Sequence, residues 1–178
     1  MTDFTLRPKP QNKRSVYLFI AFAIGAVAFT ILYLTIGQYR GLVGLVAMMF
    51  VVAAVFMYTR YMAAEYYYDV IVSDDTPIFV IRHKLGRREV TMCRIEMRHI
   101  VSIERQTKED RKAHVTPKEY ARYTYSPTVD PEITYLIITS SRTEKAEITI
   151  EANEEFAATL SAYVAEIRAT YPPDEEYE

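Results

Sequence analysis

Cysteine, tryptophan and glycine are all scarce in this chain of 178 residues, which has one cysteine, no tryptophan and five glycines. A single cysteine excludes an intrachain disulfide, which fits a reducing compartment. Cys93 lies in an alternating, strand-like run, where a free cysteine usually packs as a small hydrophobic residue rather than acting as a nucleophile. Four of the five glycines lie in or beside two apolar runs, so the sequence has no glycine-rich phosphate loop.

Residue groupings typical of metal sites and catalytic centres are also missing. The three histidines, His83, His99 and His114, are far apart and have no cysteine or carboxylate at metal-ligand spacing. No serine lies in a nucleophile-elbow sequence. We therefore expect no bound metal, no cofactor and no enzymatic activity. A membrane-tethered enzyme would need an open polar pocket, which this sequence does not indicate.

Charge is almost absent from the first third of the chain. Between Val16 and Thr59 the only charged residue is Arg40, which separates two apolar runs at residues 16–36 and 42–59. As helices these runs would be about 32 and 27 Å long, close to the hydrocarbon thickness of about 30 Å. A turn around Arg40 would join them into an antiparallel transmembrane hairpin. Neither run contains Asp, Glu, Lys or His, so we do not expect a transporter or pump.

A cleaved signal peptide is the alternative for the first run, but its apolar core would span only about 7–15 residues. The run here is longer, has no small-residue cleavage site and is followed at once by the second run. Lysine and arginine accumulate on the cytoplasmic side of membrane helices. Four cations precede the first run, while the connector has only Arg40. We therefore expect a multi-pass protein of the cell membrane with both termini in the cytoplasm.

The remainder of the chain has the composition of a soluble domain. From Arg60 onward it carries 16 lysines and arginines against 22 aspartates and glutamates, a net charge of −6. Runs rich in β-branched and aromatic residues, separated by turn residues, predict strands. The six predicted strands are 66–72, 78–81, 88–95, 100–105, 133–139 and 145–150. Gly86 lies in a hairpin turn where it can adopt positive φ.

An amphipathic helix follows the last predicted strand. Asn153 is a suitable N-cap, and Glu154 and Glu155 lie at the positive end of the helix dipole. Its apolar stripe consists of Phe156, Leu160, Tyr163, Val164, Ile167 and Tyr171. The sequence thus predicts an α+β fold, in which a two-helix transmembrane hairpin precedes an antiparallel β-barrel or sandwich closed by a C-terminal helix.

This order of elements resembles the bacterial pleckstrin-homology-like (PH-like) domains of the DUF304 type, which are often attached to membrane spans. The matching stretches are residues 68–88, the run CRIEMRHIVSI at 93–103, and residues 135–150 with the following helix. The resemblance implies a seven-stranded fold, whose seventh strand would lie near residues 120–125. It also implies a binding module.

Four regions follow from these features. A cytoplasmic N-terminal segment covers residues 1–15, the transmembrane hairpin 16–60, the PH-like cytoplasmic domain 65–171 and an acidic tail 172–178.

Basic residues gather on one predicted hairpin. Residues 82–122 carry 12 lysines and arginines against 6 acidic residues, whereas residues 123–178 carry 3 against 12. Near an inner leaflet each cation would be attracted to anionic lipid by about 1 kcal/mol. The alternative is a solvated hairpin whose cations pair with acidic neighbours. The candidate ligand- or lipid-binding residues are Arg82, Lys84, Arg87 and Arg88.

Residues 107–131 show no clear periodicity, and an irregular segment of this length is usually functional or disordered. Its second half is rich in tyrosine, which provides contact area at low entropic cost. The alternative is that these tyrosines pack onto the sheet. The candidate protein-binding residues are Tyr120, Arg122, Tyr123 and Tyr125.

The function indicated by these features is a non-catalytic, membrane-anchored binding or scaffold module. The alternative is an accessory subunit of a membrane complex, in which the apolar helices are the functional surface. We expect the lipid bilayer and a protein as partners and no nucleic acid. Small residues on both apolar runs, such as Gly25 and Gly44, would pack the hairpin against itself, or would allow a homo-oligomer.

Overall fold

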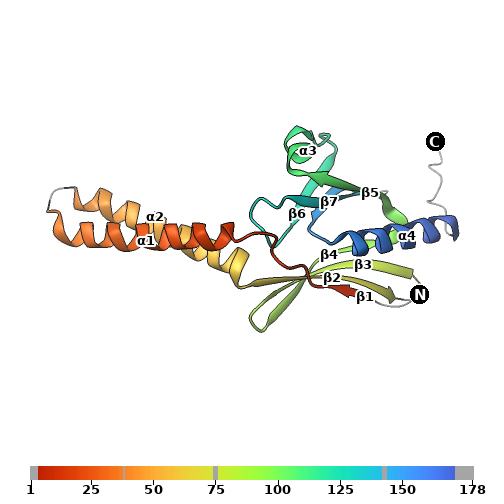
Figure 1. The fold of residues 1–178 in the computed structure, drawn as a ribbon, viewed down its shortest axis with the longest axis horizontal. Helices are drawn as coiled ribbons and strands as arrows, with labels where there is room; N and C mark the ends of the chain where they lie inside the picture. The colour runs from red at the N-terminus through yellow and green to blue at the C-terminus, as the bar shows by residue number, and fades with distance from the viewer. Residues whose placement is uncertain (1–3, 38, 74–75, 142–143, 171–178) are drawn as a thin grey trace.

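A computed structural model describes residues 4–37, 39–73, 76–141 and 144–170 (Figure 1). Two apolar helices form a rod that projects from a body of two sheets and a C-terminal helix. The predicted turn residues 74–75 and 142–143, the end of the last helix at Tyr171 and the acidic tail lie outside the described residues.

The rod is an antiparallel helix pair. Helix α1 spans Arg14–Thr35, and α2 spans Arg40–Met57 and continues into a π-helical turn, η1, at Tyr58–Met62. The ring of Phe50 on α2 covers Gly25 on α1 so closely that a Cβ at position 25 would lie 2.5 Å from a ring carbon. The small residue is therefore used within the hairpin, where it lets the two helices approach.

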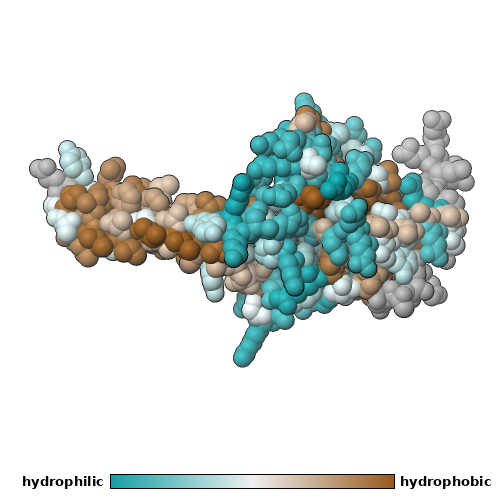
Figure 2. Space-filling view, in the orientation of Figure 1, coloured by the Kyte–Doolittle hydropathy of each residue, from teal (hydrophilic) through white to brown (hydrophobic). Residues whose placement is uncertain are grey.

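The surface of the rod is strongly apolar (Figure 2). Side chains such as Ile24, Leu34 and Met48 are each more than 60% exposed in the isolated chain. Both helices are long and apolar enough to cross a membrane. Because an exposed apolar surface of this extent is unfavourable in water, it indicates an association with a membrane.

The first sheet contains four antiparallel strands in the order β1-β2-β3-β4. Strands β2 (Ala64–Ser73), β3 (Thr76–Leu85) and β4 (Arg88–Glu96) confirm three predicted strands, and Gly86 between β3 and β4 has φ of 61°. Strand β1 (Phe4–Leu6) was not predicted. It precedes the apolar helices in sequence, yet it pairs with β2 in the register Phe4↔Val70.

The second sheet has the order β5-β7-β8-β6. A short 3-10 helix, η2 (Met97–His99), leads into β5 (Ile100–Thr107), and the other strands are β6 (Tyr120–Tyr125), β7 (Ile133–Ser140) and β8 (Lys145–Ile150). Strand β6 confirms the seventh strand expected near residues 120–125.

The prediction of an all-antiparallel barrel is wrong, because β6 runs parallel to β8 and the described strands form two separate sheets. The connection after β6 passes over the end of β8 and begins β7. The β7–β8 hairpin then returns the chain into the space beside β6. Strand partners are set by such connections, which local periodicity does not encode.

The segment 107–131, expected to be irregular, is largely ordered. It contains helix α3 (Lys108–Ala113), which has a capping box between Thr107 and Asp110, and strand β6. Helix α3 is held by side-chain contacts to the second sheet. His114 Nε2 lies 3.0 Å from both carboxylate oxygens of Glu147, and Thr116 donates to the same carboxylate at 2.7 Å.

Helix α4 (Glu154–Thr170) closes the core between the two sheets (Figure 1). As predicted, the Asn153 side chain accepts a hydrogen bond from the backbone N–H of Phe156 at 3.1 Å. Leu160 is fully buried, and Phe156, Val164 and Ile167 are also buried. The helix thus contributes one complete apolar face to the core.

Candidate functional site

The second apolar helix is joined to the domain by a very short connection. Only Ala63 separates η1 from strand β2, which begins at Ala64. Because Ala64 pairs with Leu85 across the β2–β3 ladder, the tip of the β3–β4 hairpin lies beside the end of the helix. The hairpin therefore lies at the end of the domain nearest the rod (Figure 1).

Three of the four predicted lipid-binding cations come together at this tip. Arg87 and Arg88 are exposed, and Lys84 is half-buried. Within the described part of the chain, none of them forms an ion pair or a side-chain hydrogen bond. Leu85 and Val90, which are 40% and 54% exposed, add apolar surface next to these cations. Cations beside exposed apolar side chains are suited to a membrane interface.

Arg82, the fourth predicted cation, lies elsewhere and is already paired. Its guanidinium donates to Asp69 and, at 2.5 Å, to Glu89. Asp69 is buried and also accepts a hydrogen bond from Thr5 Oγ1 at 2.6 Å. The hydrogen bond to Asp69 raises the pKa of Arg82, while burial lowers the pKa of His83 and favours its neutral form. Neither residue therefore adds free positive charge to the tip.

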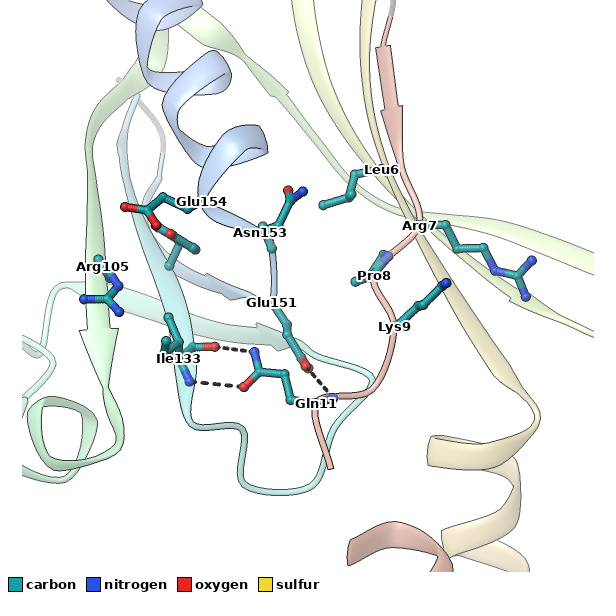
Figure 3. Close-up of a pocket in the computed structure, with 12 residues that line it drawn as sticks. Leu6, Arg7, Pro8, Lys9, Gln11, Arg105, Ile133, Glu151, Asn153 and Glu154 are labelled. Carbon is teal, nitrogen blue, oxygen red and sulfur yellow. Dashed lines mark hydrogen bonds between the residues drawn. The ribbon is translucent and has the colours of Figure 1, made fainter. Parts of the chain in front are cut away.

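The first apolar helix is tied to the domain through the residues that precede it. Figure 3 shows the Gln11 side chain bridging to the start of β7, where it donates to Ile133 O at 2.7 Å and accepts from Ile133 N at 3.2 Å. The backbone N–H of Gln11 donates to the buried carboxylate of Glu151 at 3.2 Å. Sequence analysis did not identify this connection, because a polar segment near a chain terminus gives no periodic signal.

A single carboxylate links the start of α1 to α3. Asp130 accepts hydrogen bonds from Arg14, the first residue of α1, and from Lys108 of α3, and its other oxygen lies 3.6 Å from Arg111. The hydrogen bond from Lys108, together with the nearby positive charges, lowers the pKa of Asp130. Both apolar helices are therefore attached to the domain by short, specific connections, which fix its orientation relative to the rod.

The four predicted protein-binding residues divide between two faces of β6. The rings of Tyr123 and Tyr125 are stacked with centroids 6.3 Å apart, and Tyr125 is buried. They lie on the face that packs toward the first sheet. Tyr120 and Arg122 alternate with them along the strand and therefore point to the opposite face. The structure thus brings only Tyr123 and Tyr125 together.

A groove of about 440 Å³ lies beside this tyrosine pair. Its walls come from β4 of one sheet and from β6, β7 and β8 of the other, and they include Cys93, Arg94 and Ile95. Burial raises the pKa of the Cys93 thiol, which makes it a poorer nucleophile at neutral pH.

The comparison with known families follows this geometry. A family model described as Bacterial PH-like domain (DUF6106) matches residues 9–167. The chain belongs to this bacterial PH-like family. The match includes both apolar helices as well as the two sheets and α4, and it confirms the resemblance drawn from the sequence. No curated protein matches the chain.

The bacterial PH-like domain has a further cavity, of about 530 Å³, behind the N-terminal segment (Figure 3). Its ionisable lining includes Lys9, Arg105, Glu151 and Glu154. The carboxylate of Glu151 is engaged by neutral donors, since it accepts hydrogen bonds at 2.7 Å from Ser126 and Thr128. Among the described residues, no three His, Cys, Asp or Glu side chains meet as a metal site. PH-like domains are generally non-catalytic binding modules.

Proposed function

We propose that this bacterial PH-like protein is a non-catalytic binding module, anchored in the cell membrane by α1 and α2, whose β3–β4 hairpin contacts the lipid headgroups. The observation that carries this proposal is the pairing of Ala64 with Leu85. It places the cationic tip at the point where the second apolar helix ends.

The anchor changes what the basic tip has to do. Lys84, Arg87 and Arg88 at about 1 kcal/mol each would contribute about 3 kcal/mol on an anionic surface, roughly a hundredfold in partitioning. The soluble part as a whole carries a net charge of −6, which opposes recruitment of the free domain. An anchored domain is already at the surface, so the tip contact serves to orient it.

An accessory subunit of a membrane complex is the alternative function. Its strongest sequence signal was the set of small residues on the apolar helices. Gly25 is covered by Phe50 and Gly44 lies against Tyr33 within the same hairpin. These small residues therefore have a role inside the chain, and this observation favours the binding module.

The tip contact can be tested with a fluorophore on the full-length chain in lipid vesicles. In a Cys93→Ser background, one label is placed through Arg87→Cys and a control label through Glu166→Cys near the far end of α4 (Figure 1). The vesicles contain phosphatidylglycerol and a nitroxide at headgroup depth. We expect strong quenching at position 87 and little at 166, and equal quenching at both positions would refute the contact.

The same proposal places both termini in the cytoplasm, because four cations precede α1 and only Arg40 lies in the connector. Single cysteines introduced through Asp3→Cys or Glu176→Cys in the Cys93→Ser background should react with a membrane-impermeant maleimide only after cell lysis. Labelling in intact cells would contradict this orientation.

A further inference from the structure

We propose that the groove between β4 and β6 binds an extended acidic peptide of a partner protein, which adds a strand to the edge of β4. This inference goes beyond the headgroup contact and concerns a different surface of the domain.

The groove lies where the two sheets leave open edges. Strand β4 is the last strand of the first sheet and β6 the last strand of the second. In the described ranges, each pairs with one neighbour only, β4 with β3 and β6 with β8. An edge strand presents a row of unpaired backbone N–H and C=O groups, to which a further strand can hydrogen-bond.

The edge of β4 is unusually receptive to such an addition. Its nine residues, Arg88–Glu96, include no proline, and an open edge of this length is normally protected in other proteins. An added strand would lie about 4.8 Å from β4, within the groove. Alternate side chains of that strand would then face its apolar walls, which include Met92, Tyr123 and Ile148.

The charges along the groove favour an acidic peptide. Its acidic side chains already have partners in the domain, since Glu96 accepts from Arg98 at 2.7 Å and Glu144 accepts from the Tyr123 hydroxyl at 3.1 Å. Arg94 lines the groove, is exposed and has no ion pair within the described residues. The charge available to a ligand is therefore positive.

A second copy of this chain does not fit the edge when both copies are anchored in one membrane. Strand β4 begins at Arg88, beside the end of the rod, and runs away from it to Glu96. Antiparallel pairing of β4 with its own copy requires a twofold axis perpendicular to the strands. That axis would lie in the membrane plane and would place the two anchors on opposite sides.

The native cysteine allows a direct test, because Cys93 lines the groove and is the only cysteine in the chain. The probe is a nine-residue peptide of alternating glutamate and valine, added to the detergent-solubilised full-length protein. We expect the peptide to slow alkylation of Cys93 by N-ethylmaleimide at least threefold. We also expect binding of its fluorescein-labelled form to be at least tenfold weaker in the Arg94→Glu variant.

Three controls make the result decisive. Lys112→Glu reverses an exposed cation on α3 and should leave binding unchanged. A lysine–valine peptide of equal length should not protect Cys93, and an N-methylated glutamate–valine peptide should fail because it cannot complete the ladder. An unchanged alkylation rate, or equal protection by the lysine peptide, would overturn the proposal. Since no lipid is present, the outcome is independent of the headgroup contact.

Discussion

Arg14, the first residue of helix α1, donates a hydrogen bond at 2.5 Å to Asp130, which lies in the loop between β6 and β7. Asp130 also accepts from Lys108 and has a φ of 54°. This carboxylate therefore joins an apolar helix to the second sheet, and its removal should affect the stability of the domain.

We expect Asp130→Asn to lower the melting temperature at neutral pH, because asparagine tolerates the positive φ but leaves three cations without a counter-charge. The pKa of Asp130 is lowered in the folded state, so its stabilisation is present above the unfolded pKa of about 4. It is lost as the pH falls through the folded pKa. Melting curves of the wild-type and variant proteins should thus converge at low pH, and a difference that persists there would contradict this role.

Leu160 tests the packing of α4. Its side chain is fully buried between the sheets, and truncation of a buried leucine typically costs about 2–5 kcal/mol. We expect Leu160→Ala to lower the melting temperature by several degrees or to prevent folding. Ser161→Ala, at the exposed neighbouring position of the same helix, is the matched control. A Leu160→Ala protein that melts like this control would show that α4 is not part of the core.

Gly25 tests the packing of the apolar hairpin. A methyl group at this position would lie 2.5 Å from Phe50 Cδ1, whereas one at Gly37 would meet nothing within 4 Å. The ring of Phe50 is also stacked on Phe29 at 5.3 Å, which limits its freedom to move away. We expect Gly25→Ala to reduce thermal stability in detergent micelles and Gly37→Ala to have little effect. Equal stability of the two variants would indicate that the helices do not pack through this face.

Local patterns in the sequence were sufficient for elements whose signals are local. Asn153 caps α4 and Gly86 adopts positive φ as expected, since a cap or a hairpin turn depends on neighbouring residues. Strand β1 gave no such signal, because the three residues Phe4–Leu6 are too few for a period-two pattern. Its position became clear only from its pairing with β2.

The candidate sites were predictable to a smaller extent. The sequence placed Lys84, Arg87 and Arg88 on one hairpin, but only the β2–β3 register shows that this hairpin lies beside the end of α2. It also grouped Arg82 with these cations. In the fold Arg82 meets Asp69, thirteen residues earlier in the chain, and an ion pair across strands depends on a register that composition does not contain.

The pairing of β1 with β2 has a consequence for biogenesis. Phe4 precedes both apolar helices and Val70 follows them, yet the two residues are paired in one sheet. With the helices in a bilayer, they can meet only if the chain has crossed an even number of times. A chain with one helix left uninserted would keep Phe4 and Val70 on opposite sides of the membrane. Completion of the first sheet is thus a built-in check that both helices were inserted, and failed insertion would leave an unpaired edge on β2 for proteases to recognise.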